Sequence, residues 1–148
     1  MSSRRRSRQR ALQLLFTWDA RRQPLDDVIN GYYDSLVEEE KPGRDAFAVE
    51  LVRGTVQHLA ALDEQIAKHA AHWKMDRMPA VDRNILRLAV YEMTYAGTPA
   101  AVTIDEALEL ARKFSGEESV QFINGVLDAV HRETSAKTPL HVILELEG

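Results

Sequence analysis

Positive charge is concentrated in the first ten residues of the chain. Five of these residues are arginines and none is acidic, whereas the whole chain of 148 residues carries 19 Lys+Arg against 23 Asp+Glu. Without the five arginines, 14 basic side chains would face 23 acidic ones, so a basic start precedes an acidic body. Guanidinium groups match phosphate geometry well, and a terminal block of like charge is typical of an arm that binds a polyanion. The block therefore predicts RNA or DNA as a partner, with a solvated, disordered start as the alternative.

A second candidate is Phe122, an aromatic residue among polar neighbours. On a helical wheel it lies about 100° from Ile123, away from the apolar seam of its segment. An exposed aromatic ring beside Gln121 and Asn124 would suit unpaired RNA bases, through stacking and through hydrogen bonds to base edges. The alternative is that Phe122 packs beneath the first helix, because aromatic residues at helical spacing usually belong to a core.

Metal and catalytic chemistry find little support in the sequence. His69 and His72 lie about one helical turn apart, but no third ligand completes a motif and the chain has no cysteine. Acidic residues such as Asp105, Glu106 and Glu109 suit a first helical turn without any catalysis. No glycine-rich phosphate loop accompanies them. We therefore expect a protein that is not an enzyme and that needs neither a metal nor another cofactor.

The elements that position these residues are predicted to be helices throughout. Apolar side chains recur at the i, i+3, i+4, i+7 spacing of an amphipathic helix, and no comparable run alternates with period two. This pattern predicts an all-α fold, a compact bundle of about six to seven helices. Six are expected from the arginine block to about Ala20, after Pro24, from about Arg44 to His69, from near Pro79 to Gly97, from Thr103 to Phe114, and after Ser115-Gly116.

Several local signals refine these helices. Thr103, with Glu106 three residues later, predicts a capping box at the start of the fifth helix. Gly54 is expected to leave room for a close helix crossing. We expect the same reason for Gly125, because glycine inside a helix costs about 1 kcal/mol relative to alanine. The triplet Lys41-Pro42-Gly43, after three glutamates, marks a loop.

One domain is expected to span residues 1–133, with residues 134–148 as a C-terminal tail. The segment Leu140–Leu146 is apolar and leaves three roles open: docking on the body, self-association into a homodimer, or flexibility. No window reaches the roughly 18 consecutive apolar residues of a membrane span, and the basic start lacks the apolar stretch of a secretory signal. We expect a cytoplasmic protein without a membrane partner.

Several blocks, in order, carry a resemblance to a known family. They are the arginine-rich start followed by ALQLLFTW at residues 11–18, Leu62-Asp63, MPAVDRNILRLAVYE at 78–92, VTIDEALELARKF at 102–114 and FINGVLD at 122–128. Together they resemble the NusB family of bacterial transcription antitermination factors, over about residues 4–130. The apolar end of the tail departs from the family pattern.

The resemblance implies two stacked helical bundles and a protein that binds the boxA element of ribosomal RNA transcripts. It also implies action with NusE, a small-subunit ribosomal protein, and assembly with NusA, NusG and RNA polymerase. The RNA surface carried over by position comprises Arg4, Arg5, Arg6, Arg8, Glu118, Gln121, Phe122 and Asn124. The NusE surface carried over in the same way comprises Asp82, Glu106 and Glu109.

Two other functions compete with this prediction. A similar helical domain occurs in ribosomal RNA cytosine methyltransferases, but no glycine-rich nucleotide-binding segment follows the helices here. The other alternative is a helical module that binds only proteins.

Overall fold

The structure, a computed structural model, describes residues 3–35, 44–71 and 73–136, and it is helical with short connections throughout those residues. Seven α-helices lie within them, together with one 3-10 helix, η2, at Met75–Arg77. The helices are α1 (Arg4–Arg21), α2 (Leu25–Ser35), α3 (Ala46–Gln57), α4 (Leu59–His69), α5 (Ala80–Thr94), α6 (Ala100–Phe114) and α7 (Glu117–Ala136). The predicted all-α fold is confirmed.

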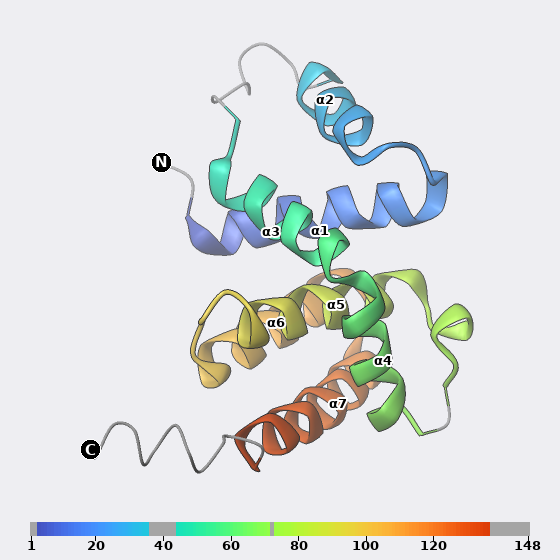
Figure 1. The fold of residues 1–148 in the computed structure, drawn as a ribbon, viewed down its shortest axis with the longest axis vertical. Coiled ribbons are helices and arrows are strands. Elements are labelled where there is room, and N and C mark those ends of the chain that lie inside the picture. Colours follow the sequence, from blue (N-terminus) through green and yellow to red (C-terminus); the bar gives the residue numbers. More distant parts are fainter. Residues whose placement is uncertain (1–2, 36–43, 72, 137–148) are drawn as a thin grey trace.

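The helices form two layers that meet at α5. Figure 1 shows α1, α2 and α3 together in one half of the molecule and α4, α6 and α7 in the other. Between them, α5 packs against α1, α3, α4, α6 and α7. Its central position explains why almost every residue from Asp82 to Glu92 is buried. The core therefore joins both layers across one helix.

Side-chain caps fix the starts of α1 and α3. The Ser3 hydroxyl accepts a hydrogen bond from the Arg6 amide at 3.1 Å, and the Asp45 carboxylate accepts one from the Ala48 amide at 3.1 Å. Such caps satisfy amides that have no partner inside the helix. Because Ser3 precedes the first arginine of α1, the arginines begin on an ordered helical turn.

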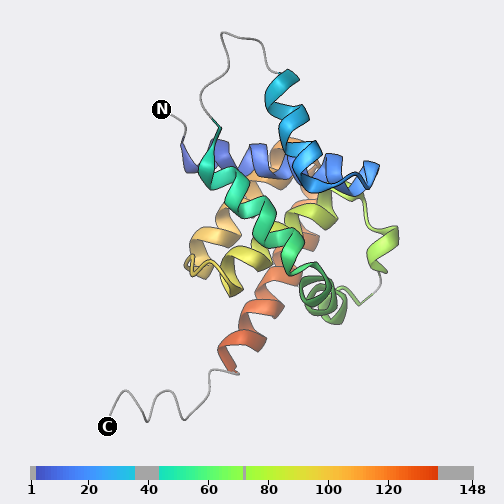
Figure 2. The ribbon, with the colours of Figure 1, turned by 45° about the horizontal axis from the view of Figure 1, so that its top comes forward.

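The single long helix predicted from about Arg44 to His69 is wrong. His58 leaves the helical conformation, with φ −102° and ψ 16°, and divides the segment into α3 and α4. Its ring stacks on that of Tyr95 with 3.9 Å between ring centroids. The bend lets α3 pack on α1 while α4 packs on α7, as Figure 2 shows from a second side. The apolar pattern hides the break because both halves keep helical spacing.

The capping box predicted at Thr103 is also wrong. α6 begins three residues earlier, after Pro99, and the Thr103 amide donates a helical hydrogen bond to the Pro99 carbonyl at 3.0 Å. The Thr103 side chain is buried, and its hydroxyl has no hydrogen-bond partner among the described residues. Glu106 instead pairs with an arginine of α1. Pro99 is the N-cap of α6 with φ −54° and ψ 137°, so the helix begins at Ala100.

The two helical glycines differ in their surroundings. A Cβ added at Gly54 would lie 2.1 Å from the Tyr91 ring, so the predicted close crossing is confirmed there. A Cβ added at Gly125 would meet nothing within 4 Å, so the close approach predicted for Gly125 is wrong.

Some sequence-based expectations concern residues that lie outside the described ranges. They are the Lys41-Pro42-Gly43 loop, the three glutamates before it, His72, and the tail from residue 137. α7 continues to Ala136, three residues past the expected domain boundary. In the part of the chain that the structure describes, no helix has the length and apolar character needed to cross a membrane.

Candidate nucleic-acid interface

The arginines at the start of α1 point in several directions and differ in what they contact. Arg8 is 7% exposed and donates hydrogen bonds of 2.8 Å from Nε and Nη2 to the carboxylate of Glu92, which is 2% exposed. The hydrogen bond to Glu92 raises the pKa of Arg8 against the opposing effect of burial. Arg8 therefore joins α1 to α5, and its guanidinium is not available to RNA in this structure.

Two further arginines, Arg5 and Arg10, form ion pairs with carboxylates of other segments. Arg5, at the surface, pairs with Glu106 of α6 through contacts of 3.1 Å, and this hydrogen bond raises the Arg5 pKa. Arg10 donates to Asp45 at 2.8 Å. The Asp45 carboxylate also accepts a hydrogen bond from the buried Ser7 hydroxyl, and it caps α3.

Arg4 and Arg6 are the exposed arginines of this block that pair with no carboxylate among the described residues. The Arg4 guanidinium lies 3.8 Å from the ring centroid of Phe47, a cation–π contact, and no carboxylate of the described residues pairs with it. Arg6 is exposed, and its side chain has neither a hydrogen bond nor an ion pair with any described residue. These two side chains form the free part of the arginine end, defined here as Arg4, Arg5 and Arg6.

From the arginine end, one edge of the molecule runs along α1 and α6. Lys113 of α6 donates to the Gln9 amide oxygen at 3.3 Å. Farther along, Phe16 and Phe114 are both exposed and help to line a cavity of about 420 Å³ between the two helices. The edge therefore passes from charged to apolar side chains as it approaches the turn between α6 and α7.

At the other end of this edge lies Phe122 of α7, beside Trp73. It is half-buried, and its ring meets the edge of Trp73 with 6.5 Å between centroids. The ring packs against the core and is neither fully exposed nor fully buried. Gln121 and Asn124, beside it on α7, are exposed, as is Glu118.

The acidic candidates also divide by exposure. Asp82 is 3% exposed, and its carboxylate accepts hydrogen bonds from the Ser115 and Ser119 hydroxyls at 2.7 and 2.8 Å. It fastens α5 to the α6–α7 turn, so it offers little to a partner protein. Glu109 is exposed and pairs with Arg112 on its own helix, and Glu106 holds Arg5.

Sequence reasoning missed Trp73 as a site residue. It considered the segment only for metal ligands, yet an aromatic residue followed by Lys74 and Arg77 between two helices is itself a signal for nucleic acid. No group of three or more His, Cys, Asp or Glu side chains suited to a metal occurs among residues 3–35, 44–71 and 73–136. His69 contacts Glu133 across α4 and α7.

The two helical layers, with a basic and an aromatic end on one edge, define a class of small helical proteins. The model of the NusB family matches residues 5–132. The transcription antitermination protein NusB of Solibacter usitatus (strain Ellin6076) is 74% identical over 133 residues, which cover 90% of this chain and 91% of that protein. The NusB of Salinispora arenicola (strain CNS-205) is 47% identical, over 88% of this chain and 96% of that one.

Solved structures agree with the sequence relatives. NusB of T. maritima superposes with a TM-score of 0.77 at 33% identity, over 89% of this chain and 92% of that one. A crystal structure of antitermination factors NusB and NusE in complex with dsRNA gives a TM-score of 0.77 at 28% identity, over 88% of this chain and 96% of the matched one. The chain belongs to the NusB family, as the sequence blocks predicted.

Proposed function

We propose that the protein is a transcription antitermination factor that binds boxA RNA of ribosomal RNA transcripts together with NusE. It acts in the cytoplasm and joins NusA, NusG and RNA polymerase without a catalytic step of its own. The observation that carries the proposal is the edge along α1 and α6. At one end lie Arg4 and Arg6, which pair with no carboxylate in the described part of the chain, and at the other lies Phe122. Its relatives bear the name transcription antitermination protein, and one related structure holds NusB, NusE and dsRNA.

The two ends of this edge have different tasks in RNA binding. Arg4 and Arg6, with a share from Arg5, bind phosphates and supply affinity that depends on salt. Phe122 stacks on a base, and Gln121 and Asn124 hydrogen-bond to base edges, so this end supplies selectivity. Arg8 has no part in the proposal because Glu92 holds it inside the protein.

Fluorescence anisotropy with a labelled boxA RNA, with and without NusE, tests this function. The double variant Arg4→Ala/Arg6→Ala is expected to reduce the slope of log K against log salt by about 1.4, since each phosphate contact to a single strand contributes about 0.7. Arg132→Ala is the matched control, because Arg132 is exposed but lies far along α7 and pairs with Asp128. Equal affinity for a scrambled RNA in the presence of NusE would contradict boxA recognition.

NusE is proposed to bind the acidic side of α6, where Glu106 and Glu109 lie. A basic ribosomal protein is attracted by such carboxylates, whereas buried Asp82 is held by the Ser115 and Ser119 hydroxyls and has no direct part in this surface. Glu109→Lys is expected to weaken NusE binding at least several-fold in a titration without RNA. Glu64→Lys is the control, because Glu64 is also exposed but lies on α4, away from this surface. Equal effects of the two variants would remove α6 from the NusE interface.

A further inference from the structure

We propose that Trp73 and Phe122 form a pocket for one RNA base, and that Lys74 and Arg77 bind the phosphates beside it. The inference rests on the proposed RNA function and extends the RNA surface to residues 73–77, beyond Phe122. It also assigns the base a chemical class, one that carries an amino group.

The first support is the exposure of Trp73. This large side chain is 49% exposed, although tryptophan is usually mostly buried in soluble proteins. Its ring and that of Phe122 lie at 64° to each other, and with Pro79 they line a cavity of about 330 Å³. Two aromatic walls beside an open cavity form a stacking platform, on which each base is worth about tenfold or more in affinity.

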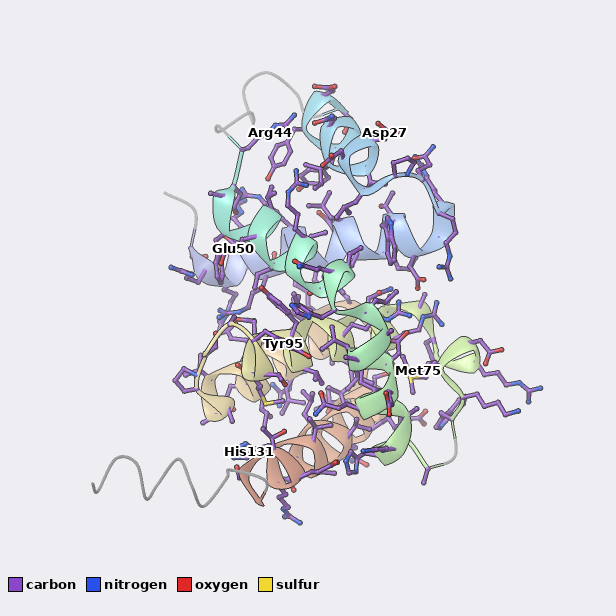
Figure 3. All side chains as sticks on the ribbon, viewed as in Figure 1. Asp27, Arg44, Glu50, Met75, Tyr95 and His131 are labelled. Atoms are coloured by element: carbon purple, nitrogen blue, oxygen red, sulfur yellow. The ribbon has the colours of Figure 1, made fainter. Side chains whose placement is uncertain are left out.

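The second support is that hydrogen bonds anchor the backbone of residues 73–78. The Trp73 amide donates to the Ala70 carbonyl at 2.9 Å. Arg83 of α5 donates from Nη1 to the carbonyls of Met75 and Met78 at 2.9 and 3.1 Å, and it pairs with Asp19 of α1 at 2.7 Å. Figure 3 labels Met75 on the short η2 helix. The platform is thus formed before any ligand arrives, which lowers the cost of binding.

The third support is the polar lining of the cavity. Glu118 is exposed at its rim, and Asp82 with Ser119 lines its inner part. A carboxylate at the rim accepts hydrogen bonds, so it favours a base with amino donors: cytosine, adenine or guanine. Uracil has carbonyl oxygens at the equivalent positions and would face the carboxylate unfavourably.

Two aromatic rings beside carboxylates would also suit an arginine or lysine of a partner protein. The charges on residues 73–77 favour RNA instead. Lys74 and Arg77 follow Trp73, are exposed, and have no ion pair with any described residue. Within residues 73–77 these two positive side chains stand against one acidic side chain, Asp76, so this segment attracts phosphate.

Tryptophan fluorescence of the full chain tests the pocket directly. In Trp18→Phe, Trp73 is the remaining tryptophan, and adding a single-stranded boxA RNA is expected to quench its emission with the Kd measured by anisotropy. Trp73→Ala is expected to weaken RNA binding about tenfold or more, and Trp73→Phe to keep most of the affinity. Tyr95→Ala is the matched control, because Tyr95 is 45% exposed but lies at the end of α5.

Two further measurements separate the parts of the proposal. In the first measurement, the amino-bearing bases of the RNA are replaced by uridine, one at a time. At one position we expect the resulting loss of RNA affinity to be clearly smaller for Glu118→Ala than for the unmodified protein. Lys74→Ala/Arg77→Ala is expected to reduce the salt slope by about 1.4.

The outcomes distinguish this pocket from the proposed function. If Trp73→Ala binds RNA as tightly as the unmodified protein while Arg4→Ala/Arg6→Ala binds more weakly, the pocket is overturned and the RNA function stands. If Trp73→Ala loses NusE and keeps RNA, the pocket holds a cation of the partner, and the inference is overturned. If the unmodified protein binds no boxA RNA with NusE present, the function fails and the pocket fails with it.

Discussion

Arg8 of α1 and Glu92 of α5 form a buried, bidentate ion pair that joins the two helical layers. Both hydrogen bonds are 2.8 Å long, and Glu92 accepts a third from the Thr98 hydroxyl at 3.1 Å. The chain thus uses one arginine of a basic block for internal structure, while its neighbours Arg4 and Arg6 remain at the surface.

Arg8→Ala is expected to destabilise the protein by roughly 3–5 kcal/mol, because it leaves the Glu92 carboxylate buried without its partner. The free energy of unfolding in urea measures this loss. Arg6→Ala is the control and should change stability by less than about 0.5 kcal/mol. Arg8→Met/Glu92→Met is expected to regain much of the loss, because it removes both buried charges. A small effect of Arg8→Ala would show that water reaches Glu92.

Two buried aspartates, Asp19 in α1 and Asp45 at the N-cap of α3, predict how the stability of the protein responds to acid. Burial alone would raise the pKa of Asp19, but hydrogen bonds from Arg83 and Asn84 and the charge of Arg87 outweigh it and lower the pKa. At Asp45, burial likewise acts to raise the pKa, and hydrogen bonds from Ser7, the Ala48 amide and Arg10 lower it below its usual value. Both carboxylates therefore stabilise the folded protein in their charged form.

A lowered folded-state pKa means that the stabilisation is fully present above the unfolded-state pKa of about 3.9 and is lost as pH falls through the folded value. We therefore expect the free energy of unfolding to decrease below about pH 4 and to be insensitive to these two groups near neutrality. Urea unfolding at a series of pH values measures this. Asp19→Asn should lower stability at neutral pH and flatten the acid dependence. An unchanged acid dependence in that variant would remove Asp19 from the explanation.

Gly54 and Gly125 predict opposite effects of the same substitution. Gly54→Ala would place a methyl group against the Tyr91 ring, and overpacking of this kind costs roughly 1–3 kcal/mol. Gly125→Ala meets open space in the middle of α7 and should stabilise the protein by up to about 1 kcal/mol. Thermal unfolding of both variants gives the comparison. A stabilised Gly54→Ala, or a destabilised Gly125→Ala, would contradict these surroundings.

Helix content was predictable because amphipathic spacing survives in almost every segment. The wrong helix boundaries share one physical cause, the contacts that a segment makes with other parts of the fold. His58 interrupts a continuous apolar pattern because α3 and α4 pack on different helices, and a pattern read along one chain does not reveal the partner. Thr103 and Glu106 have the spacing of a capping box, but Pro99 starts the helix earlier and Arg5 engages Glu106.

The basic composition of the first ten residues predicted a site for a polyanion. The sequence did not predict which individual residues take part in it. The arginine block gave the charge, but the sequence does not distinguish Arg8, which turns inward to Glu92, from Arg6, which does not. Asp82 is an acidic residue, a type usually found at the surface, yet it is buried. Its carboxylate accepts hydrogen bonds from the Ser115 and Ser119 hydroxyls. Trp73 is brought to Phe122 by the fold, across a separation that no local motif spans.

The ion pair of Arg5 with Glu106 predicts that one substitution affects RNA binding and NusE binding in opposite directions. Glu106→Gln removes the charge that holds Arg5, so the guanidinium becomes free for an RNA phosphate while the acidic side of α6 loses a carboxylate. We expect tighter binding to boxA RNA at low salt, a salt slope steeper by up to about 0.7, and weaker binding to NusE. Anisotropy with RNA alone and a titration with NusE alone measure the two effects separately. Glu109→Gln is the matched control, since Glu109 pairs with Arg112: it should weaken NusE binding and leave the RNA salt slope nearly unchanged. If Glu106→Gln leaves the RNA slope unchanged, then Arg5 takes no part in RNA binding, and Arg4 and Arg6 alone make up the arginine end.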